Sequence, residues 1–526
     1  MSERAWWKSA VIYEIYPRSF QDSNGDGVGD LTGILTRLEY VAALGVTAVW
    51  IAPIYPSPMA DFGYDVANYC DIDPMFGTLA EFEQLVDHAH RLGLKVLLDF
   101  VPNHTSDRHP WFEESRSSRD NPKRDWYLWR DPAPDGGPPN NWLSRMGGSA
   151  WERDKLTGQY YYHAFLREQP DLNWRNQEVR RAMDDVLRFW LDRGVDGFRV
   201  DVLWLLIKDA QFRDNPPNPA YRPGEPQHHR QLQTYTEDQP EVHDIVRSMR
   251  ATLSEYGERV LIGEIYLPVP QLVKYYGING DGADMPFNFQ LLNTPWKASE
   301  IARVIKDYDR ALPEHAWPNW VLGNHDNRRV ASRVGTVQAR VAAVLLLTLR
   351  GTPTLYYGDE VGMTDGDIAS DEIRDPAELR QPGLGQGRDP ERTPMRWDSS
   401  LPNGGFTTGR PWLPIGTTRS VREQERDASS MLSLYRRLLA LRRGNAALLA
   451  GTIENVAAHG DVLTYERCYR DQRLFIALNM GSENAAVLSP AGVVLLSTFA
   501  DRDGQTLEAG VIRISAGEAL VVAAYD

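Results

Sequence analysis

The hydrophobic positions of the first hundred residues alternate between short continuous runs and a helical period. The runs at 10–20, 46–54 and 94–104 predict strands. The segments at 33–45 and 79–93 place apolar residues three and four apart and end at a glycine, which predicts capped helices. Repeated strand–helix–strand units imply parallel strands with helices outside them.

This alternation is interrupted once and then resumes. Residues from about 104 to 172 are rich in Trp, Pro, Gly, Asn and charge and show no long period, which predicts an inserted loop-rich domain. The helical pattern returns at 178–194, followed by apolar runs at 195–202, 259–266, 282–289, 320–327 and 351–360. Beyond about residue 445, short strand-like runs separated by turn residues predict a small antiparallel β domain.

Eight strand–helix units in about 370 residues favour a (β/α)₈ barrel over an open doubly wound sheet. No glycine-rich phosphate-binding turn follows the first strand, which argues against dinucleotide binding. We therefore predict a discontinuous barrel (1–103 and 173–445), an inserted domain (104–172) and a C-terminal β domain (446–526).

The composition of the chain limits the classes of partner that the protein is suited to bind. The formal net charge of −15 argues against nucleic acid or an anionic membrane as the main partner. Two cysteines, Cys70 and Cys468, exclude a disulfide framework and a four-cysteine zinc site. The start, MSERAWWKSA, does not have the pattern of a signal peptide, and the apolar run at 341–349 is far shorter than a bilayer span. We expect a cytoplasmic enzyme, monomeric or homodimeric.

Three acidic residues each lie at the end of an apolar run: Asp201, Glu264 and Asp326. Carboxylates at the mouths of buried strands are either paired structurally or functional, and barrel chemistry lies at the C-terminal ends of strands. Metal binding, proton abstraction and glycosyl transfer are all compatible with three carboxylates. A catalytic metal would need clustered ligands, and only His325 adjoins Asp326. Glycoside cleavage needs one carboxylate and one protonated carboxyl.

Several sequence motifs, in a fixed order along the chain, distinguish between these chemistries. DFVPNH at 99–104, GFRVD at 197–201, GEIY at 263–266 and GNHD at 323–326 resemble the α-amylase superfamily of glycoside hydrolases. QPDLNW at 169–174, the front end at 6–31 and RTPMRW at 392–397 resemble its α-glucosidase and oligo-1,6-glucosidase branch. The resemblance covers essentially the whole chain.

The resemblance implies a role for each carboxylate. Asp201 is the expected nucleophile that forms a β-glucosyl–enzyme ester, Glu264 the general acid/base, and Asp326 the carboxylate that holds sugar hydroxyls in the distorted transition state. Arg199, two residues before Asp201 on the same strand face, is expected to keep the nucleophile ionised. Glu264 must be protonated near neutrality, which requires burial or nearby negative charge.

Further matches imply a pocket for the terminal sugar. The resemblance assigns substrate contacts to Asp61, Tyr64, His104, Phe165, Arg199, His325 and Arg388. In the family pattern, Asp61 and Arg388 pair to close the far side of the bound glucose, which implies exo action at a non-reducing end.

The stretch at 22–30 places oxygen ligands at alternating positions, as calcium loops do. It is not an EF-hand, because its twelfth position is Gly33 and a predicted strand precedes it. The resemblance implies one structural Ca²⁺ or Mg²⁺ held by Asp22, Asn24, Asp26, the Val28 carbonyl and Asp30, and no organic cofactor. An Asx/Gly turn without an ion is the alternative.

Linkage and acceptor stay open. In the family, a valine directly after the nucleophile is associated with α-1,6 linkages, and Val202 occupies that position here. The loop at 214–230, however, departs from the oligo-1,6-glucosidase pattern. The main hypothesis is a retaining exo-α-glucosidase acting on short α-glucosides of the maltose or isomaltose type, with possible transglucosylation. The alternative is a sucrose isomerase or sucrose hydrolase. A non-catalytic relative, like the ectodomain of transporter heavy chains, would lack one or more of the three carboxylates, and this chain has all three.

Overall fold

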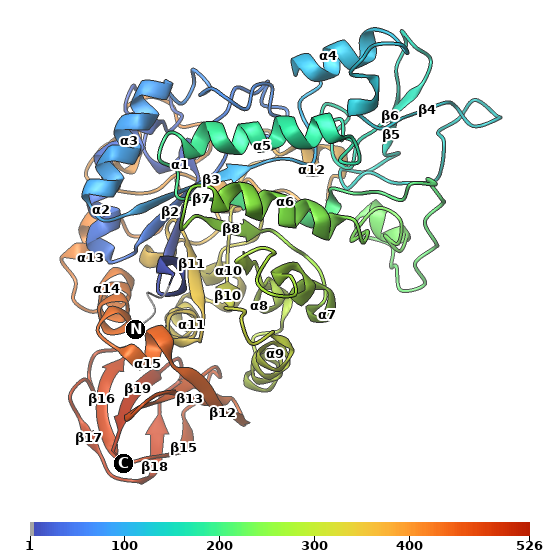
Figure 1. The fold of residues 1–526 in the computed structure, drawn as a ribbon. Coiled ribbons are helices and arrows are strands. Elements are labelled where there is room, and N and C mark those ends of the chain that lie inside the picture. The colour runs from blue at the N-terminus through green and yellow to red at the C-terminus, as the bar shows by residue number, and fades with distance from the viewer. Residues whose placement is uncertain (1–4, 526) are drawn as a thin grey trace.

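Eight parallel strands form the centre of the molecule in a computed structural model that describes residues 5–525 (Figure 1). They pair in the order β10-β11-β1-β2-β3-β7-β8-β9, and a parallel bridge between Asn288 and Trp320 joins the two ends of this series. The predicted (β/α)₈ barrel is therefore confirmed. Its strands are β1 (Ile12–Ile15), β2 (Ala48–Ile51), β3 (Lys95–Phe100), β7 (Gly197–Val200), β8 (Val260–Gly263), β9 (Met285–Pro286), β10 (Asn319–Val321) and β11 (Thr352–Tyr356).

The first strand is shorter than the apolar run at 10–20 predicts. It ends at Ile15, and a helical turn, α1 (Pro17–Phe20), follows at once. Pro17 occupies the first helical position, where its fixed φ and its missing N–H are both tolerated. The chain therefore turns away from the barrel just after Glu14, which remains fully buried.

Long amphipathic helices surround the barrel (Figure 1). Asp30, Thr78 and Asn176 cap the first long helices after β1, β2 and the insertion by accepting hydrogen bonds from backbone N–H groups. The longer helices are α2 (Leu31–Leu44), α3 (Leu79–Arg91), α5 (Gln177–Leu191), α6 (Val242–Ser254), α9 (Ala298–Ala311), α11 (Thr336–Thr348) and α14 (Met431–Arg443). The short ones are α7 (Val269–Leu272), α8 (Gln290–Asn293), α10 (Val330–Val334), α12 (Pro376–Arg380), α13 (Val421–Glu425) and α15 (Ala446–Ala450). Single 3₁₀ turns are η1 (Trp6–Lys8), η2 (Arg124–Trp126), η3 (Leu203–Leu205), η4 (Gln227–Arg230), η5 (Val273–Tyr276), η6 (Asp359–Val361), η7 (Pro390–Arg392) and η8 (Pro402–Gly405).

The apolar run at 341–349 belongs to α11, which is buried on nearly all sides because it packs against both α14 and β14 of the C-terminal domain. Thr348 on this helix forms a hydrogen bond with the Tyr465 hydroxyl. Among the helices described, none combines the length and the apolarity that crossing a bilayer requires.

The segment between β3 and α5 forms a small aromatic-rich subdomain. It contains α4 (Pro110–Ser117) and an antiparallel sheet of β4 (Trp129–Arg130), β6 (Tyr160–Tyr162) and β5 (Trp151–Arg153). Phe112 stacks on Trp129 at 5.7 Å between ring centroids. The segment after β7 docks on this subdomain, since Trp142 donates its indole N–H to the carbonyl of Arg213.

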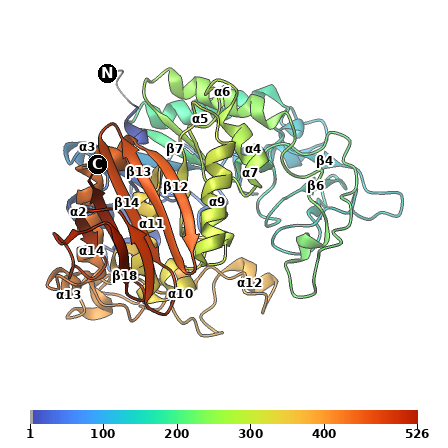
Figure 2. The same ribbon diagram turned by 90° about the horizontal axis from the view of Figure 1, so that it is seen from below.

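The C-terminal part is antiparallel β structure, as predicted, and its sheet lies beside α9 (Figure 2). The larger sheet has the order β12-β13-β14-β19-β16-β17, and β15 pairs with β18. These strands are β12 (Thr452–His459), β13 (Val462–Tyr469), β14 (Gln472–Asn479), β15 (Ala485–Ser489), β16 (Gly492–Ser497), β17 (Thr506–Leu507), β18 (Gly510–Ile514) and β19 (Ala519–Ala524).

Candidate active site

The three strand-end carboxylates line one cavity of about 450 Å³ at the C-terminal end of the barrel. Asp201 and Glu264 immediately follow β7 and β8 and continue the ladder, since their N–H groups donate to the carbonyls of Phe100 (2.8 Å) and Val200 (2.9 Å). Asp326 lies in the turn after β10. Residues 62 to 125 positions apart thus meet because parallel barrel strands end at the same rim.

Arg199 lies beneath the cavity and contacts three carboxyls. Its guanidinium lies 2.8 Å from Asp99, 2.9 Å from Asp201 and 2.7 Å from Glu264, and its side chain is fully buried. Burial raises the pKa of Asp201 and of Glu264, while the Arg199 charge acts in the opposite direction on both. One cation cannot balance three buried carboxylates, so the Asp201–Glu264 pair retains a proton.

Both carboxyls of the pair face the same guanidinium, and Glu264 Oε2 also accepts from the N–H of Val202 at 2.9 Å. When Glu264 holds the shared proton, Asp201 loses the repulsion of that neighbour and keeps the attraction of Arg199. The arrangement gives one ionised and one protonated carboxyl, the division that retaining glycoside cleavage requires.

Asp326 is held as an anion. Burial acts to raise its pKa, but the neighbouring His325 ring and the guanidinium groups of Arg388 and Arg392 outweigh burial and hold the pKa of Asp326 below its usual range. Arg392 Nη2 lies 2.7 Å from Asp326 Oδ1, and its Nε donates to the carbonyl of His325. The role of Arg392 was not predicted, although it is the first residue of the RTPMRW motif.

The predicted pocket residues divide into a wall and a buried layer. Asp61, Tyr64, His104, Phe165 and Arg388 line the cavity. Asp61 and Arg388 form an ion pair of 2.6 Å that closes one side. The other two residues predicted to bind the sugar, Arg199 and His325, are fully buried behind this wall.

Other parts of the cavity wall come from segments that sequence patterns did not connect. The loop at 214–230, singled out for its composition, contributes His228 and His229 to the lining. Trp204 and Arg145 also face the cavity, and both contact Glu237, at 3.0 Å and 2.6 Å. The remaining lining residues are Met146, Val202, Tyr266, Asn293, Asn327, Ala377 and Gln386.

Val202 adopts a backbone conformation that β-branched residues rarely take, with φ +39° and ψ +46°. This left-handed turn directs its N–H to Glu264 Oε2 while Asp201 completes the strand ladder. Backbone strain of this kind persists where the surrounding structure imposes it, and here it lies between nucleophile and acid.

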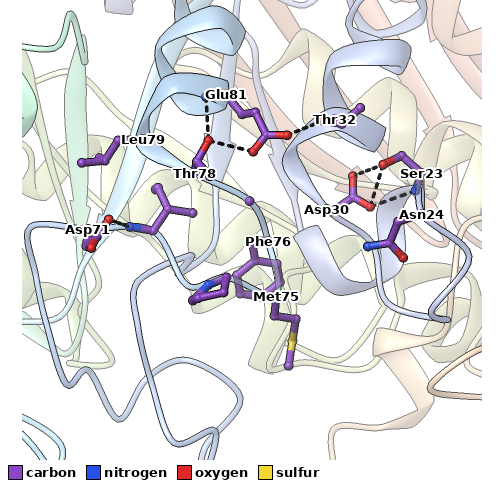
Figure 3. A pocket seen from close by; sticks show the side chains of 13 residues that line it. Ser23, Asn24, Asp30, Thr32, Asp71, Met75, Phe76, Thr78, Leu79 and Glu81 are labelled. Carbon is purple, nitrogen blue, oxygen red and sulfur yellow. Dashed lines mark hydrogen bonds between the residues drawn. The ribbon is translucent and has the colours of Figure 1, made fainter.

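The loop at 22–30 lies away from this cavity, beside a second cavity of about 520 Å³ that also borders the N-terminus of α3 (Figure 3). Asp22 accepts hydrogen bonds from the N–H groups of Asn24, Gly25 and Gly27. Asp30 accepts from Ser23 and also caps α2 through the Gly33 N–H. Within residues 5–525, no three His, Cys, Asp or Glu side chains converge as a metal-binding group.

The donors of this loop nevertheless fit a hard cation. Its side chains supply carboxylate and amide oxygens, the ligands that Ca²⁺ and Mg²⁺ prefer. Positive φ angles at Gly25 and Gly27 fold the loop back on itself, and a side chain at Gly27 would collide with the Arg410 carbonyl. The conformation of the loop therefore requires glycine at these two positions.

Comparisons with known proteins agree with the geometry. Residues 14–451 match the family described as Alpha amylase, catalytic domain. A probable alpha-glucosidase of Rhizobium meliloti (strain 1021) is 45% identical over 92% of this chain and 91% of its own. An oligo-1,6-glucosidase of Heyndrickxia coagulans is 38% identical over 95% of this chain and 97% of its own.

Solved structures extend the likeness to the whole fold. The alpha-glucosyl transfer enzyme XgtA superposes with a TM-score of 0.94 at 40% identity, covering 99% of this chain and all of that one (100%). The trehalulose synthase MutB from Pseudomonas mesoacidophila superposes with a TM-score of 0.91 at 33% identity, covering 98% of this chain and 99% of that one.

Proposed function

This chain belongs to the alpha-amylase family, and from that premise we propose that it is a retaining, exo-acting α-glucosidase. It releases or transfers glucose from the non-reducing end of short α-glucosides of the maltose and isomaltose type. The observation that carries the proposal is the meeting of Asp201, Glu264 and Asp326 in a cavity closed on one side by the Asp61–Arg388 pair.

Two displacements at the anomeric carbon account for the reaction. Asp201 attacks C1 while Glu264 gives its proton to the departing glycosidic oxygen, which forms a β-glucosyl ester and breaks the α-linkage. Glu264, now ionised, then takes a proton from water or from an acceptor hydroxyl as that oxygen attacks C1. The ester bond breaks, Asp201 leaves as a carboxylate, and the product has the α configuration again.

Exo action follows from the closed side of the cavity. The Asp61–Arg388 ion pair, backed by Asp375 at 2.6 Å from Arg388, occupies the space into which a longer chain would extend beyond the terminal glucose. Charged groups form strong hydrogen bonds with sugar hydroxyls, so the Asp61–Arg388 pair also recognises the non-reducing end.

The choice between hydrolysis and transfer depends on the opposite side, where an acceptor enters. Similarity to an alpha-glucosyl transfer enzyme supports a transglucosylating enzyme. Similarity to a trehalulose synthase supports the second candidate, a sucrose-directed enzyme: an isomerase, in which released fructose itself is the acceptor, or a sucrose hydrolase, in which water is the acceptor. Both use the same glucosyl–enzyme ester and differ only in what resolves it.

A panel of maltose, isomaltose, sucrose, trehalose and an aryl α-glucoside, with all products resolved by chromatography, tests these alternatives. Glucose release from maltose or isomaltose supports the α-glucosidase. Conversion of sucrose to an isomeric disaccharide, with no activity on the others, supports the sucrose-directed enzyme. Failure to act on any α-glucoside contradicts both.

Three further properties are part of the proposal. A structural Ca²⁺ or Mg²⁺ in the loop at 22–30 would be held by Asp22, Asn24, Asp26, Asp30 and the Val28 carbonyl, and would stabilise the first β/α connection without entering the reaction. A cytoplasmic location is supported by two free cysteines, Cys70 and Cys468. A monomer or homodimer is the proposed assembly.

A further inference from the structure

Glu14 is a buried acid on β1 to which the reaction assigns no role. It is fully buried and pairs in register with Trp50 of β2 and Tyr356 of β11. Its Oε1 lies 2.5 Å from Nδ1 of His325, although 311 positions separate the two residues. This carboxyl lies inside the barrel beside the active site, where burial strongly disfavours a charge.

The other ring nitrogen of His325 faces the cavity side. Nε2 lies 2.6 Å from the Tyr64 hydroxyl and 3.3 Å from Asp326 Oδ2. The imidazole is parallel to the ring of Tyr64 (12°) and to that of Tyr16 (14°), so its orientation is fixed by packing. What remains to be decided is which nitrogen carries the hydrogen.

Counting hydrogens around Tyr64 favours a hydrogen on Nε2. The Tyr64 hydroxyl has a single hydrogen and lies 3.1 Å from Asp99 Oδ2, which as a carboxylate only accepts. When Tyr64 donates to Asp99, its contact with His325 requires an N–H on Nε2. The carboxylate of Asp326 favours the same choice, because a lone pair on Nε2 would face its negative charge.

Glu14 completes this arrangement as a donor. Its Oε2 is buried and has no hydrogen-bond partner. A bare carboxylate oxygen there would cost more than the carbonyl oxygen of a neutral acid, so the hydrogen on Oε1 is the favourable state. Burial also raises the pKa of Glu14 well above its ordinary value and lowers that of His325, which leaves both groups neutral.

We propose that Glu14 is a positioning residue for the glycosyl transfer: its carboxyl donates a hydrogen bond to His325 Nδ1 and thereby keeps the hydrogen of the imidazole on Nε2, facing Tyr64 and Asp326. The proposal rests on the proposed function for its kinetic consequence. Without this donor, the hydrogen moves to Nδ1, and the Nε2 lone pair repels the carboxylate that holds the sugar in the transition state.

Two substitutions separate donation from mere filling of space. In Glu14→Gln, the amide N–H replaces the acid hydrogen, and we expect kcat for an aryl α-glucoside to stay within about threefold of wild type. In Glu14→Met, the volume is kept and the donor is lost, and we expect kcat to fall roughly 10- to 100-fold with little change in KM.

A double-variant cycle tests whether Glu14 acts through His325. On a His325→Ala background, adding Glu14→Met should change kcat by less than about twofold, because the interaction is already gone. The matched control is Glu360→Gln, a buried acid bonded to Tyr13 and Tyr40 outside the cavity, which should leave kcat unchanged.

The tautomer itself is measured without substrate. In protein labelled with ¹⁵N-histidine, the His325 signals, assigned by their loss in His325→Gln, should show an unprotonated Nδ1 and a protonated Nε2 in wild type. A protonated Nδ1 in wild type, full kcat in Glu14→Met, or additive losses in the cycle would overturn the proposal. Wild-type protein that cleaves no α-glucoside contradicts the proposed function alone, since the ¹⁵N spectrum still tests the tautomer.

Discussion

Arg388 Nη2 lies 2.6 Å from Asp61 Oδ1, and this contact joins residues 327 positions apart across one side of the catalytic cavity. Both side chains are nearly buried, and Arg388 also contacts Asp375 and Asp326. The pair therefore serves as a barrier and as a source of charge at the same time, and removing either member should affect chain-length preference as well as rate.

We expect Asp61→Ala to lower kcat/KM for maltose about 100-fold, because a charged hydrogen-bond partner of the terminal glucose is lost and Arg388 is left partly unpaired. The loss for maltohexaose should be smaller, since the barrier is opened. Chromatography of products from end-labelled substrates measures both. Arg328→Ala, which removes an exposed guanidinium paired with Asp365, is the control. An unchanged ratio of the two substrates would show that the pair does not set chain length.

Asp201→Asn should lose more than about 10³-fold in kcat while keeping the wild-type melting temperature, because the amide cannot form the glucosyl ester. The wild-type enzyme should release α-glucose first, as NMR detects before mutarotation. Initial β-glucose would mean inversion and would remove Asp201 as the nucleophile.

Val202 tests linkage preference. Val202→Thr keeps the β-branched shape at the same strained φ and adds a hydroxyl to the cavity wall. We expect the ratio of kcat/KM for isomaltose to that for maltose to fall by about 3- to 10-fold, and the unfolding free energy to fall by about 1–3 kcal/mol because the added hydroxyl is buried. Equal effects on the two disaccharides would assign linkage preference to another part of the wall.

Glu391 should make the protein less stable as pH rises. Burial raises its pKa to about 8, against about 4.3 in an unfolded chain. The folded state thus holds a proton that the unfolded state has released, and the stability this contributes is complete below about pH 4 and lost as pH rises through about 8. In Glu391→Gln, unfolding free energy should exceed that of wild type by roughly 1–3 kcal/mol at pH 9, with the difference shrinking toward pH 4.

Thermal melts across this range, with the exposed Glu314→Gln as control, measure the effect. A pH-independent difference between Glu391→Gln and wild type would mean that Glu391 is ionised in the folded state throughout.

Removal of divalent cations tests the loop at 22–30. Dialysis against a chelator should lower the melting temperature by several degrees, readdition of Ca²⁺ or Mg²⁺ should restore it, and Asp26→Ala should abolish the response. Among the proposed ligands, Asp26 is chosen for substitution because its Oδ1 accepts from the Val28 N–H of its own loop, so its removal leaves the contacts of this loop with the rest of the protein in place. Identical melts with and without cations would favour the Asx/Gly turn.

Sequence patterns were sufficient for the barrel because the information is local. Each strand has its own apolar run, each helix its period and cap, and a carboxylate at a strand end needs no knowledge of the rest of the fold. Asp201 and Glu264 could therefore be identified before any contact was known. The weakest strand, β9, has only two residues, and its place depends on the ring closing through the Asn288–Trp320 bridge.

The protonation pattern of the site is a tertiary property. A guanidinium shared among Asp99, Asp201 and Glu264, the contact of Arg392 with Asp326 and the hydrogen bond between Glu14 and His325 join residues that are distant in the chain. The spacing of residues along the sequence does not show which buried carboxyls share one guanidinium.

By itself, the sequence determined the order of strands and helices and the strand-end carboxylates, because these follow from local periodicity and residue type, while glycoside chemistry was implied by the resemblance of its motifs to a known family. Only the tertiary structure decided that Asp201 and Glu264 share one buried cation, how Val202 is strained between nucleophile and acid, and which side chains line the rest of the cavity. Burial and the distances between charges set those properties, and both arise only when the chain closes on itself.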